Sequence, residues 1–199
     1  MIQIYLARYE ADHEKENWKR EHELGKKLLS IGLKDLYGIC PEAYKELVIM
    51  KGEHGKPYLK DFPHIHYNIS HTDGMVACGI GDKELGIDVE RIRPFRHNIL
   101  RKVFSDAERC RMEQIPEEEH CRYFFQIWTL KESYVKAVGC GITFPLPHVS
   151  FEWREGASPV CSIPGASFQQ TLLEGGYVLS VCTLGEEEMK LCKNIDYKL

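Results

Sequence analysis

The segment FFQIWTLKESYVKAVGCGI, residues 124–142, predicts a helix with two unlike faces. At about 100° per residue, one face gathers five apolar side chains, those of Ile127, Leu130, Tyr134, Ala137 and Val138. The opposite face carries two aromatic and two charged side chains, those of Phe125, Trp128, Glu132 and Lys136. The apolar face should meet a core, whereas the mixed face fits neither a core nor a fully solvated surface. The ordinary alternative for Glu132 and Lys136 is an i,i+4 ion pair contributing about 0.2–0.5 kcal/mol.

The composition is that of an ordinary globular protein. The 199 residues suffice for one large domain or two small ones, and 43% hydrophobic with 28% charged residues argues against disorder. The net charge of −4 gives no reason to expect a nucleic-acid partner. No apolar run approaches the roughly 20 residues that span a bilayer, and the N-terminal segment turns acidic too soon for a signal peptide. We therefore expect a soluble, cytoplasmic protein with no membrane partner.

The cysteines predict neither disulfides nor a zinc site. There are eight, scattered along the chain without a C-x-x-C pair. Several fall in apolar stretches such as MVACGI and VLSVCTL, which is typical of small buried hydrophobic residues in a reducing compartment.

The first half of the chain predicts a strand, a helix and a series of hairpins. Apolar alternation predicts a strand at 2–6, and a charged amphipathic pattern predicts a helix over 13–32 that ends near Gly32. KELVIM and KPYLK flank a predicted turn at KGEHGK, and further strands are predicted at HIHYNIS, MVACGIG and LGIDVERI, with a hairpin turn at Asp73-Gly74.

The second half repeats this order of helix, strands and hairpin. Ser105 and Glu108 form an S-x-x-E capping box that starts a helix at Ser105, and Gly139 with the glycine and prolines after it ends the long helix. Strands follow at VSFEW and on both sides of Gly175-Gly176. We predict an α/β (α+β) fold, with similar subdomains at residues 1–85 and 86–199 that share an interface where a ligand would bind.

Three carboxylates are candidate cation ligands. Asp88 and Glu90 point to the same face of the strand LGIDVERI, where two like charges repel. Either they line a solvated edge or a cation neutralises them, and Glu132 offers a third carboxylate. An all-oxygen ligand set suits Mg²⁺ or Mn²⁺ rather than zinc. With a lysine nearby, the pattern indicates phosphoryl chemistry as a class.

Two polar loops are ambiguous by themselves. Ser70 and His71 are either a locally bonded turn or a donor pair for a phosphate, and Lys56-Pro57 is either a plain turn or a basic contact to an anion. The charges of the first helix are interpreted as solvated, because glutamates interleave with the lysines. No phosphate-binding P-loop, G-x-G-x-x-G or G-x-S-x-G sequence is present.

The stretches GKPYL, HYNISHTDGMVACGI, LGIDVERI, FSDAE and WTLKESYVKAVGCGI occur in the order and approximate spacing of the Sfp-like 4'-phosphopantetheinyl transferases. Between about Gly55 and Phe144 the chain resembles this family. The resemblance implies a monomeric pseudo-dimer of two α/β subdomains with coenzyme A between them. It also implies a Mg²⁺-dependent enzyme that moves phosphopantetheine from coenzyme A to a serine of an apo carrier protein and releases adenosine 3',5'-bisphosphate.

The resemblance also implies roles for individual residues. Asp88, Glu90 and Glu132 match the family's Mg²⁺-binding acids, and Lys136 matches its lysine at the diphosphate. Ser70 and His71 match contacts to the coenzyme A phosphates, and Lys56-Pro57 match the loop near the adenine end. Asp88, Glu132 and Lys136 are thus the expected catalytic residues, with Glu132, directly or through a metal-bound water, as the base. Contacts to the 3'-phosphate are expected from three basic residues of the first helix, Lys19, Arg20 and Lys26, although Arg20 is one residue out of register with the family.

Two rival functions remain open at this point. One is a Mg²⁺ enzyme that acts on another small diphosphate, which would turn over without a protein acceptor. The other is a non-catalytic module that binds carrier proteins, although such a module has no need of clustered carboxylates. The carrier itself could serve fatty-acid, polyketide or nonribosomal peptide synthesis.

Overall fold

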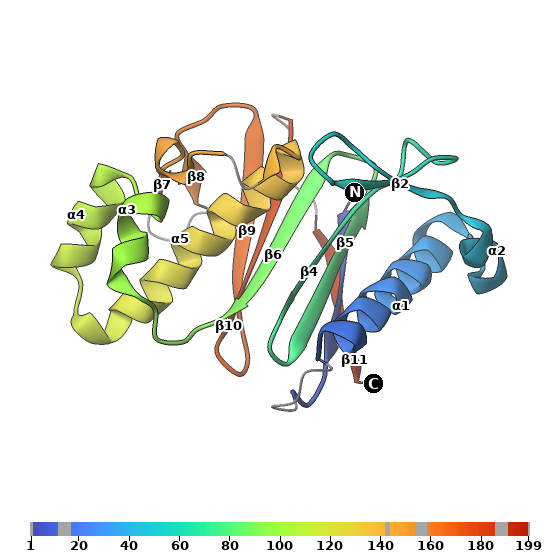
Figure 1. Cartoon of the computed structure of the whole chain (residues 1–199), viewed down its shortest axis with the longest axis horizontal. Helices are drawn as coiled ribbons and strands as arrows, with labels where there is room; N and C mark the ends of the chain where they lie inside the picture. Colours follow the sequence, from blue (N-terminus) through green and yellow to red (C-terminus); the bar gives the residue numbers. More distant parts are fainter. Residues whose placement is uncertain (1, 12–16, 142–143, 154–158, 186–190, 199) are drawn as a thin grey trace.

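The computed structural model describes residues 2–11, 17–141, 144–153, 159–185 and 191–198. The described chain forms two main sheets, each covered on one face by a long helix (Figure 1). Helices and strands are mixed in both halves, so the α+β fold expected from the sequence is confirmed. Among the described residues, no helix has the length and apolar character needed to cross a bilayer.

The first sheet contains four strands in the order β11-β1-β5-β4. The first half of the chain comprises β1 (Ile2–Arg8), α1 (Asn17–Tyr37), α2 (Pro41–Glu46), β2 (Ile49–Lys51), β3 (Pro57–Leu59), β4 (His66–Thr72) and β5 (Met75–Gly81). Strands β1 and β4 both pair antiparallel with β5, and the C-terminal strand β11 (Leu191–Lys198) pairs parallel with β1. Leu28, Leu29 and Leu33 of α1 pack with Tyr5 and Ile80 in the core of this half.

The second sheet contains three strands in the order β6-β10-β9. The second half comprises β6 (Leu85–Arg91), the 3-10 turn η1 (His97–Ile99), α3 (Leu100–Val103), α4 (Asp106–Gln114), α5 (Glu117–Val138), the 3-10 turn η3 (Leu146–His148), β7 (Phe151–Glu152), β8 (Val160–Cys161), β9 (Ala166–Leu173) and β10 (Tyr177–Leu184). Helix α5 packs on β6 and β10 and buries Ile127, Leu130 and Ala137.

The two halves repeat one arrangement. In each, a first strand is followed by a long helix and then by an antiparallel hairpin whose second strand pairs with the first, which gives β1-β5-β4 and β6-β10-β9. The hairpins turn at Gly74 and at Gly175-Gly176, all with positive φ, where glycine is favoured. Strand β11 lies in the sheet of the first half, across the predicted boundary, so the division into 1–85 and 86–199 stays a prediction.

Most of the local expectations for the helix ends are confirmed. Ser105 Oγ accepts the Glu108 N–H while the Ser105 N–H donates to Glu108 Oε2 at 2.8 Å, which is the capping box at the start of α4. Gly139 ends α5 in the left-handed conformation. Val138 was expected in the core but is 43% exposed, because it is the last helical residue and lines a surface cavity beside Lys56.

The expected end of the first helix at Gly32 is wrong. Helix α1 continues to Tyr37, and Gly32 is buried against the sheet. A Cβ at this position would lie 2.1 Å from Ile80 Cδ1 and 2.7 Å from Tyr5 Cε2, so the glycine allows the helix to approach the strands closely. The predicted start of this helix, at residues 13–16, lies outside the described residues.

Cys78 and Cys182 are free thiols and are buried, as the sequence predicts. No group of three or more His, Cys, Asp and Glu side chains within the described ranges is placed to hold a metal ion.

Side chains join the two sheets where β4 runs beside β6 (Figure 1). Asn68 Oδ1 accepts the N–H of Ile87 at 2.9 Å, and Ser70 Oγ accepts the N–H of Val89 at 3.2 Å. The constant offset of 19 residues means that the strands run parallel. We call this contact between β4 and β6 the seam. In the seam, side chains of β4 accept the backbone N–H groups of β6, so these groups are hydrogen-bonded without a backbone-to-backbone ladder between the two strands.

The seam also depends on Gly86, because α5 lies directly against this residue. A Cβ here would be 2.1 Å from Ser133 O and 2.3 Å from the Ala137 amide nitrogen, both backbone atoms. We expect Gly86→Ala to destabilise the fold by about 2–3 kcal/mol and to lower the Tm by about 4–12 °C, measured by differential scanning calorimetry. Gly52→Ala is the matched control, since its Cβ would meet only Lys56 O at 3.6 Å. Equal Tm values for the two variants would contradict this packing argument.

Candidate active site

The centre of the site is a buried carboxylate at the seam. Asp88 on β6 is 4% exposed, and its Oδ1 accepts hydrogen bonds from Ser70 Oγ at 2.9 Å and Lys136 Nζ at 2.6 Å. Lys136 Nζ also donates to Ser70 Oγ at 3.0 Å. The fold thus brings together three predicted site residues, Ser70 from β4, Asp88 from β6 and Lys136 from α5.

The second oxygen of Asp88 is left open. Asp88 Oδ2 is buried and has no hydrogen-bond partner among the described residues. Burial raises the pKa of Asp88, which the positive charge of Lys136 only partly opposes. Buried carboxylate oxygens nearly always have a hydrogen-bond partner in folded proteins, so Asp88 Oδ2 is expected to bind a hydrogen-bond donor or a cation.

Glu132 lies one helical turn before Lys136 on α5. Burial raises its pKa, the negative charges of Asp88 and Glu90 raise it further, and Lys136 opposes them. Its carboxylate has no hydrogen-bond partner within the described part of the chain. The three predicted acids therefore share one electrostatic environment, although they are not already gathered into a closed metal-binding cluster. Their role as metal ligands stays a prediction.

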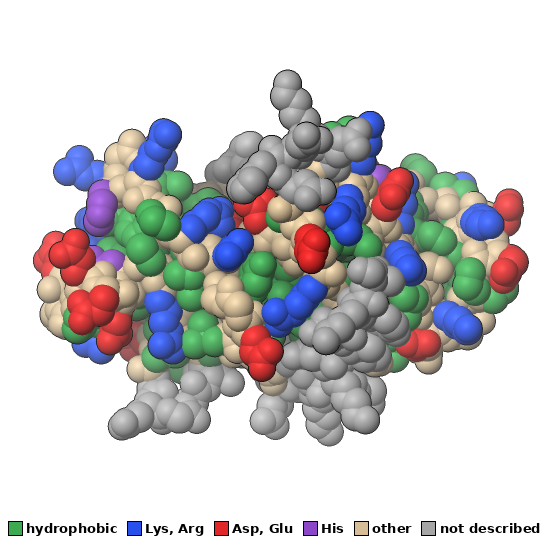
Figure 2. All heavy atoms as spheres, turned by 90° about the horizontal axis from the view of Figure 1, so that it is seen from below, with side chains coloured by type: hydrophobic (Ala, Val, Ile, Leu, Met, Phe, Trp, Pro, Cys, Tyr) green, Lys and Arg blue, Asp and Glu red, His purple; other side chains and the backbone are tan. Residues whose placement is uncertain are grey.

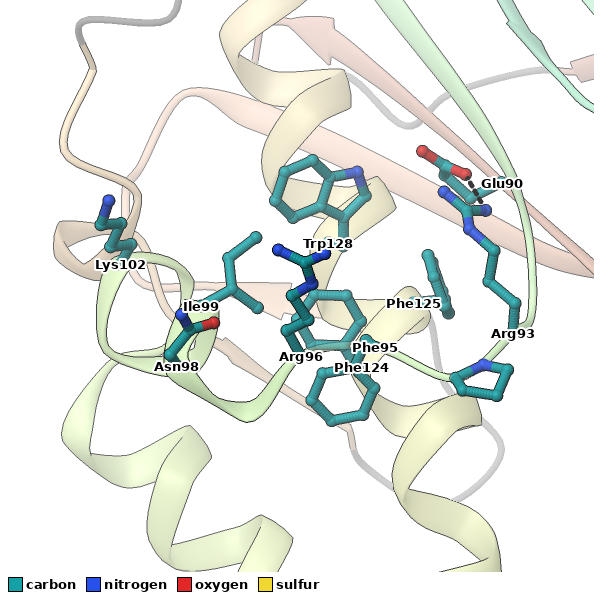
Figure 3. Close-up of a pocket in the computed structure, with 11 residues that line it drawn as sticks. Glu90, Arg93, Phe95, Arg96, Asn98, Ile99, Lys102, Phe124, Phe125 and Trp128 are labelled. Carbon is teal, nitrogen blue, oxygen red and sulfur yellow. Dashed lines mark hydrogen bonds and ion pairs between the residues drawn. The ribbon is translucent and has the colours of Figure 1, made fainter.

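Glu90 is held by two donors at the end of β6. Thr72 Oγ1 donates to Glu90 Oε2 at 3.2 Å, and Arg93 donates to the same oxygen at 2.7 Å. The Arg93 guanidinium also lies 4.8 Å from the ring centre of Phe125 (Figure 3). Sequence reasoning missed Arg93, although the run RIRPFR directly after LGIDVE was available as a signal.

An aromatic cavity of about 460 Å³ accounts for the two aromatic side chains on the mixed face of α5, those of Phe125 and Trp128. Phe95, Phe124, Phe125 and Trp128 line it, and Figure 3 shows the Trp128 indole beside the Arg96 guanidinium. Its cations are Arg93, Arg96 and Lys102. In the space-filling view, hydrophobic and basic side chains lie together on the half of the molecule that carries α3, α4 and α5 (Figure 2).

A fully buried ion pair fixes α5 next to Glu132. Lys131 Nζ donates to Glu108 Oε2 and to Val103 O, both at 2.6 Å, and to Leu146 O at 3.2 Å. Glu108 Oε1 accepts the Phe151 N–H at 3.0 Å. This pair ties α3, α4, η3 and β7 to α5. The capping role of Glu108 could be predicted from the S-x-x-E spacing, whereas no local sequence pattern indicated the burial of Lys131.

His71 lies away from the centre, on the opposite face of β4 from Ser70. His71 Nδ1 is 2.9 Å from Glu21 Oε2, and Tyr9 OH donates to Glu21 Oε1. Glu21 was interpreted as a solvated helix charge, but it is buried, because α1 turns this side chain towards β4. That interpretation of Glu21 is wrong.

The remaining predicted binding residues lie further apart. Lys56 Nζ donates to Ala137 O at 2.7 Å and pairs with Glu84, and Lys56-Pro57 line a separate cavity of about 430 Å³. Arg20 lies over the Tyr9 ring at 5.3 Å, next to Glu21. Lys26 is exposed on α1, and Lys19 is exposed beside Trp18.

We expect Lys131→Met to destabilise the protein by about 3–5 kcal/mol, because it leaves Glu108 as an unpaired buried charge. The measurement is the free energy of unfolding in urea, and Glu108→Gln in the same chain should restore part of the loss. Lys102→Met is the control, since Lys102 is exposed. A loss below about 1 kcal/mol, as for an exposed ion pair, would contradict the importance of the buried pair.

The raised pKa of Glu132 predicts a pH-dependent stability. A carboxyl group whose pKa is higher in the folded than in the unfolded chain favours folding while protonated, and this contribution is lost as pH rises through the folded-state pKa. Glu132→Gln should therefore raise the Tm at about pH 8, and the gain should vanish near about pH 4. Thermal unfolding in EDTA checks this, with the exposed Glu113→Gln as control. No gain at the higher pH would show that Glu132 is not strained in the fold.

Comparison with known proteins places the chain in a family. A family model described as the 4'-phosphopantetheinyl transferase superfamily matches residues 84–182. A 4'-phosphopantetheinyl transferase of Bacillus subtilis is 29% identical over 185 residues, which cover 88% of this chain and 77% of that protein. The 4'-phosphopantetheinyl transferase gsp of Aneurinibacillus migulanus is 33% identical over 144 residues, 70% of this chain and 60% of that protein.

Two further matches are partial. The 4'-phosphopantetheinyl transferase Sfp of Bacillus subtilis (strain 168) is 30% identical over 134 residues, so this chain spans about 60% of that relative. A solved holo-(acyl-carrier-protein) synthase of Bacillus anthracis is 15% identical with a TM-score of 0.45, covering 52% of this chain and 96% of that one. On the sequence matches, the chain belongs to the 4'-phosphopantetheinyl transferase superfamily of enzymes.

Proposed function

We propose that this enzyme transfers 4'-phosphopantetheine from coenzyme A to a serine of an apo carrier protein and releases adenosine 3',5'-bisphosphate. The observation that carries the proposal is the joined group of Asp88, Ser70 and Lys136, with Glu132 one helical turn away. We further propose that the enzyme acts as a cytoplasmic monomer on an acyl or peptidyl carrier, because one chain supplies both repeated halves and Cys78 and Cys182 are buried free thiols.

The reaction exchanges one phosphorus–oxygen bond for another. The serine Oγ forms a bond to the phosphorus that bears pantetheine, the bond from this phosphorus to the bridging oxygen breaks, and adenosine 3',5'-bisphosphate leaves with the electron pair. Such a transfer needs a base for the hydroxyl proton, positive charge at the diphosphate and accurate positioning of the two reactants.

Residues of α5 meet the first two needs. Glu132 takes the proton from the serine hydroxyl, and its raised pKa brings its basicity closer to neutral pH, where a general base works best. Lys136 places positive charge one turn further along the same helix, where it would meet the diphosphate. Ser70 and Asp88 hold the Lys136 ammonium in place.

The residues present fit a magnesium ion. Asp88 Oδ2 is buried and unpartnered among the described residues, Glu132 is likewise free of hydrogen bonds there, and every candidate ligand is an oxygen. Glu90 uses Oε2 for Thr72 and Arg93, which leaves its other oxygen for a metal. Mg²⁺, or Mn²⁺ in its place, would supply the charge that neutralises these acids and the diphosphate.

The aromatic cavity supports a protein acceptor. Arg96 and Lys102 place positive charge at its rim, and Trp128, Ile99 and Lys102 also line a smaller cavity that reaches Glu132. An acidic protein surface with an apolar contact point would complement this face and bring a serine towards the base. A small diphosphate substrate would have no use for such a face.

Intact mass spectrometry tests the proposal directly. An apo acyl or peptidyl carrier protein incubated with the enzyme, coenzyme A and Mg²⁺ should gain one phosphopantetheine group, and EDTA should prevent the gain. Glu132→Gln should slow transfer by about 10²–10⁴-fold, the usual contribution of a general base, whereas Glu113→Gln on α4 should not change the rate.

Three outcomes would contradict the proposal or part of it. No mass gain with several carriers, from a folded and metal-loaded enzyme, would favour the module that only binds carriers. Release of a product from a small diphosphate without any carrier would favour the other rival. A near-normal rate for Glu132→Gln would remove Glu132 from the chemistry while leaving the transferase in place.

A further inference from the structure

A buried carboxylate on α1 has both of its oxygens occupied. The Glu21 side chain is only 9% exposed, Tyr9 OH donates to Oε1, and His71 Nδ1 lies 2.9 Å from Oε2. Burial, together with the bond to Glu21, raises the pKa of Tyr9. The Tyr9 phenol therefore stays protonated and remains a donor at any ordinary pH. Glu21 and Tyr9 thus form a fixed support beneath the ring of His71.

Two exposed basic side chains rest on this support. The His71 side chain is 54% exposed, and since Nδ1 faces Glu21, the Nε2 edge of the ring is the one turned away from the carboxylate. The Arg20 guanidinium lies over the Tyr9 ring at 5.3 Å and donates to Glu10 O at 3.2 Å. Tyr9 therefore holds Arg20 through its ring and Glu21 through its hydroxyl, and Glu21 in turn contacts His71, which is distant in the sequence.

The position of this group relative to Lys136 matters. Ser70 and His71 are consecutive on β4, so their side chains point to opposite faces of the strand. Ser70 faces Lys136 and Asp88, whereas His71 faces α1. The end of β4 therefore separates the Lys136 ammonium on one face from the His71 imidazole on the other. Coenzyme A likewise carries two separate anionic groups, the diphosphate and the 3'-phosphate.

We propose that Glu21 and Tyr9 are positioning residues: they hold His71 and Arg20, for which the family resemblance implies contacts to the phosphates of coenzyme A, in the arrangement that receives the 3'-phosphate. This inference rests on the proposed function, because it takes coenzyme A as the donor. Glu21 does not touch the ligand. Its charge is already engaged by Tyr9 and His71, and it acts by fixing the ring of His71 so that no rotamer freedom is lost when the phosphate binds.

Calorimetric titration with two nucleotides tests the positioning role without turnover. Adenosine 3',5'-bisphosphate carries the 3'-phosphate, and adenosine 5'-monophosphate lacks it. We expect Glu21→Leu to weaken bisphosphate binding about tenfold, the equivalent of one charge-assisted hydrogen bond, with a change of less than about threefold for the monophosphate. Glu21→Gln keeps an acceptor for one partner and should lose less.

A double-mutant cycle shows whether Glu21 acts through His71. If it does, Glu21→Leu combined with His71→Ala should bind the bisphosphate no more weakly than His71→Ala alone. Tyr9→Phe removes one hydroxyl from the support, so it gives a milder variant should Glu21→Leu fold poorly. It should weaken bisphosphate binding in the same selective way, and circular dichroism with the Tm verifies that each variant is folded.

The opposite results would overturn the inference. Equal losses for the two nucleotides, additive effects in the cycle, or equal affinity of the unmodified enzyme for both nucleotides would each do so. The mass assay separates this from the proposed function. If the enzyme modifies the carrier with coenzyme A but gives any of those binding results, only the positioning role of Glu21 is overturned. If the carrier is not modified at all, both the transferase proposal and the role of Glu21 are overturned.

Discussion

The contact of Asp88 with Ser70 and Lys136 is the interaction on which the rest of the structure depends. The sheets of the two halves meet at β4 and β6 through side chains of Asn68 and Ser70 that accept backbone N–H groups of β6. Lys136 reaches this seam only because Gly86 lets the backbone of α5 lie against β6. The groups that join the halves are therefore also the groups that make the site.

Two ion pairs made by lysines of α5 serve opposite purposes. The pair of Lys131 and Glu108 is satisfied on every side, since carbonyl oxygens and backbone N–H groups complete it, and it fixes four segments around α5. The pair of Lys136 and Asp88 is left incomplete at Asp88 Oδ2. A buried oxygen without a partner costs stability, and burial raises the pKa of both Asp88 and Glu132. Such strain is typical of sites that bind a charged ligand rather than of sites that only stabilise a fold.

The sequence predicted features set by neighbouring residues and missed those set by distant ones. The capping box at Ser105 and the alternation of β4 and β6 depend on spacings of two or three residues, so they could be recognised without a structure. Glu21 and Lys131 could not, because their burial follows from which face of a helix meets distant segments. Gly32 was mistaken for a helix end because a glycine that stops a helix and one that allows close packing are the same in a sequence.

The repeated architecture suggests why one polar group lies on each face of β4. This strand is the edge at which the first sheet meets the second half, so one of its faces looks towards α5 and the other towards α1. A donor molecule with two separate phosphate groups can use both faces only if it passes over the end of the strand, where Ser70 and His71 are consecutive. A ligand with a single phosphate group would engage only one face. The duplicated fold thereby provides a structural reason to recognise a donor that carries phosphate at two places.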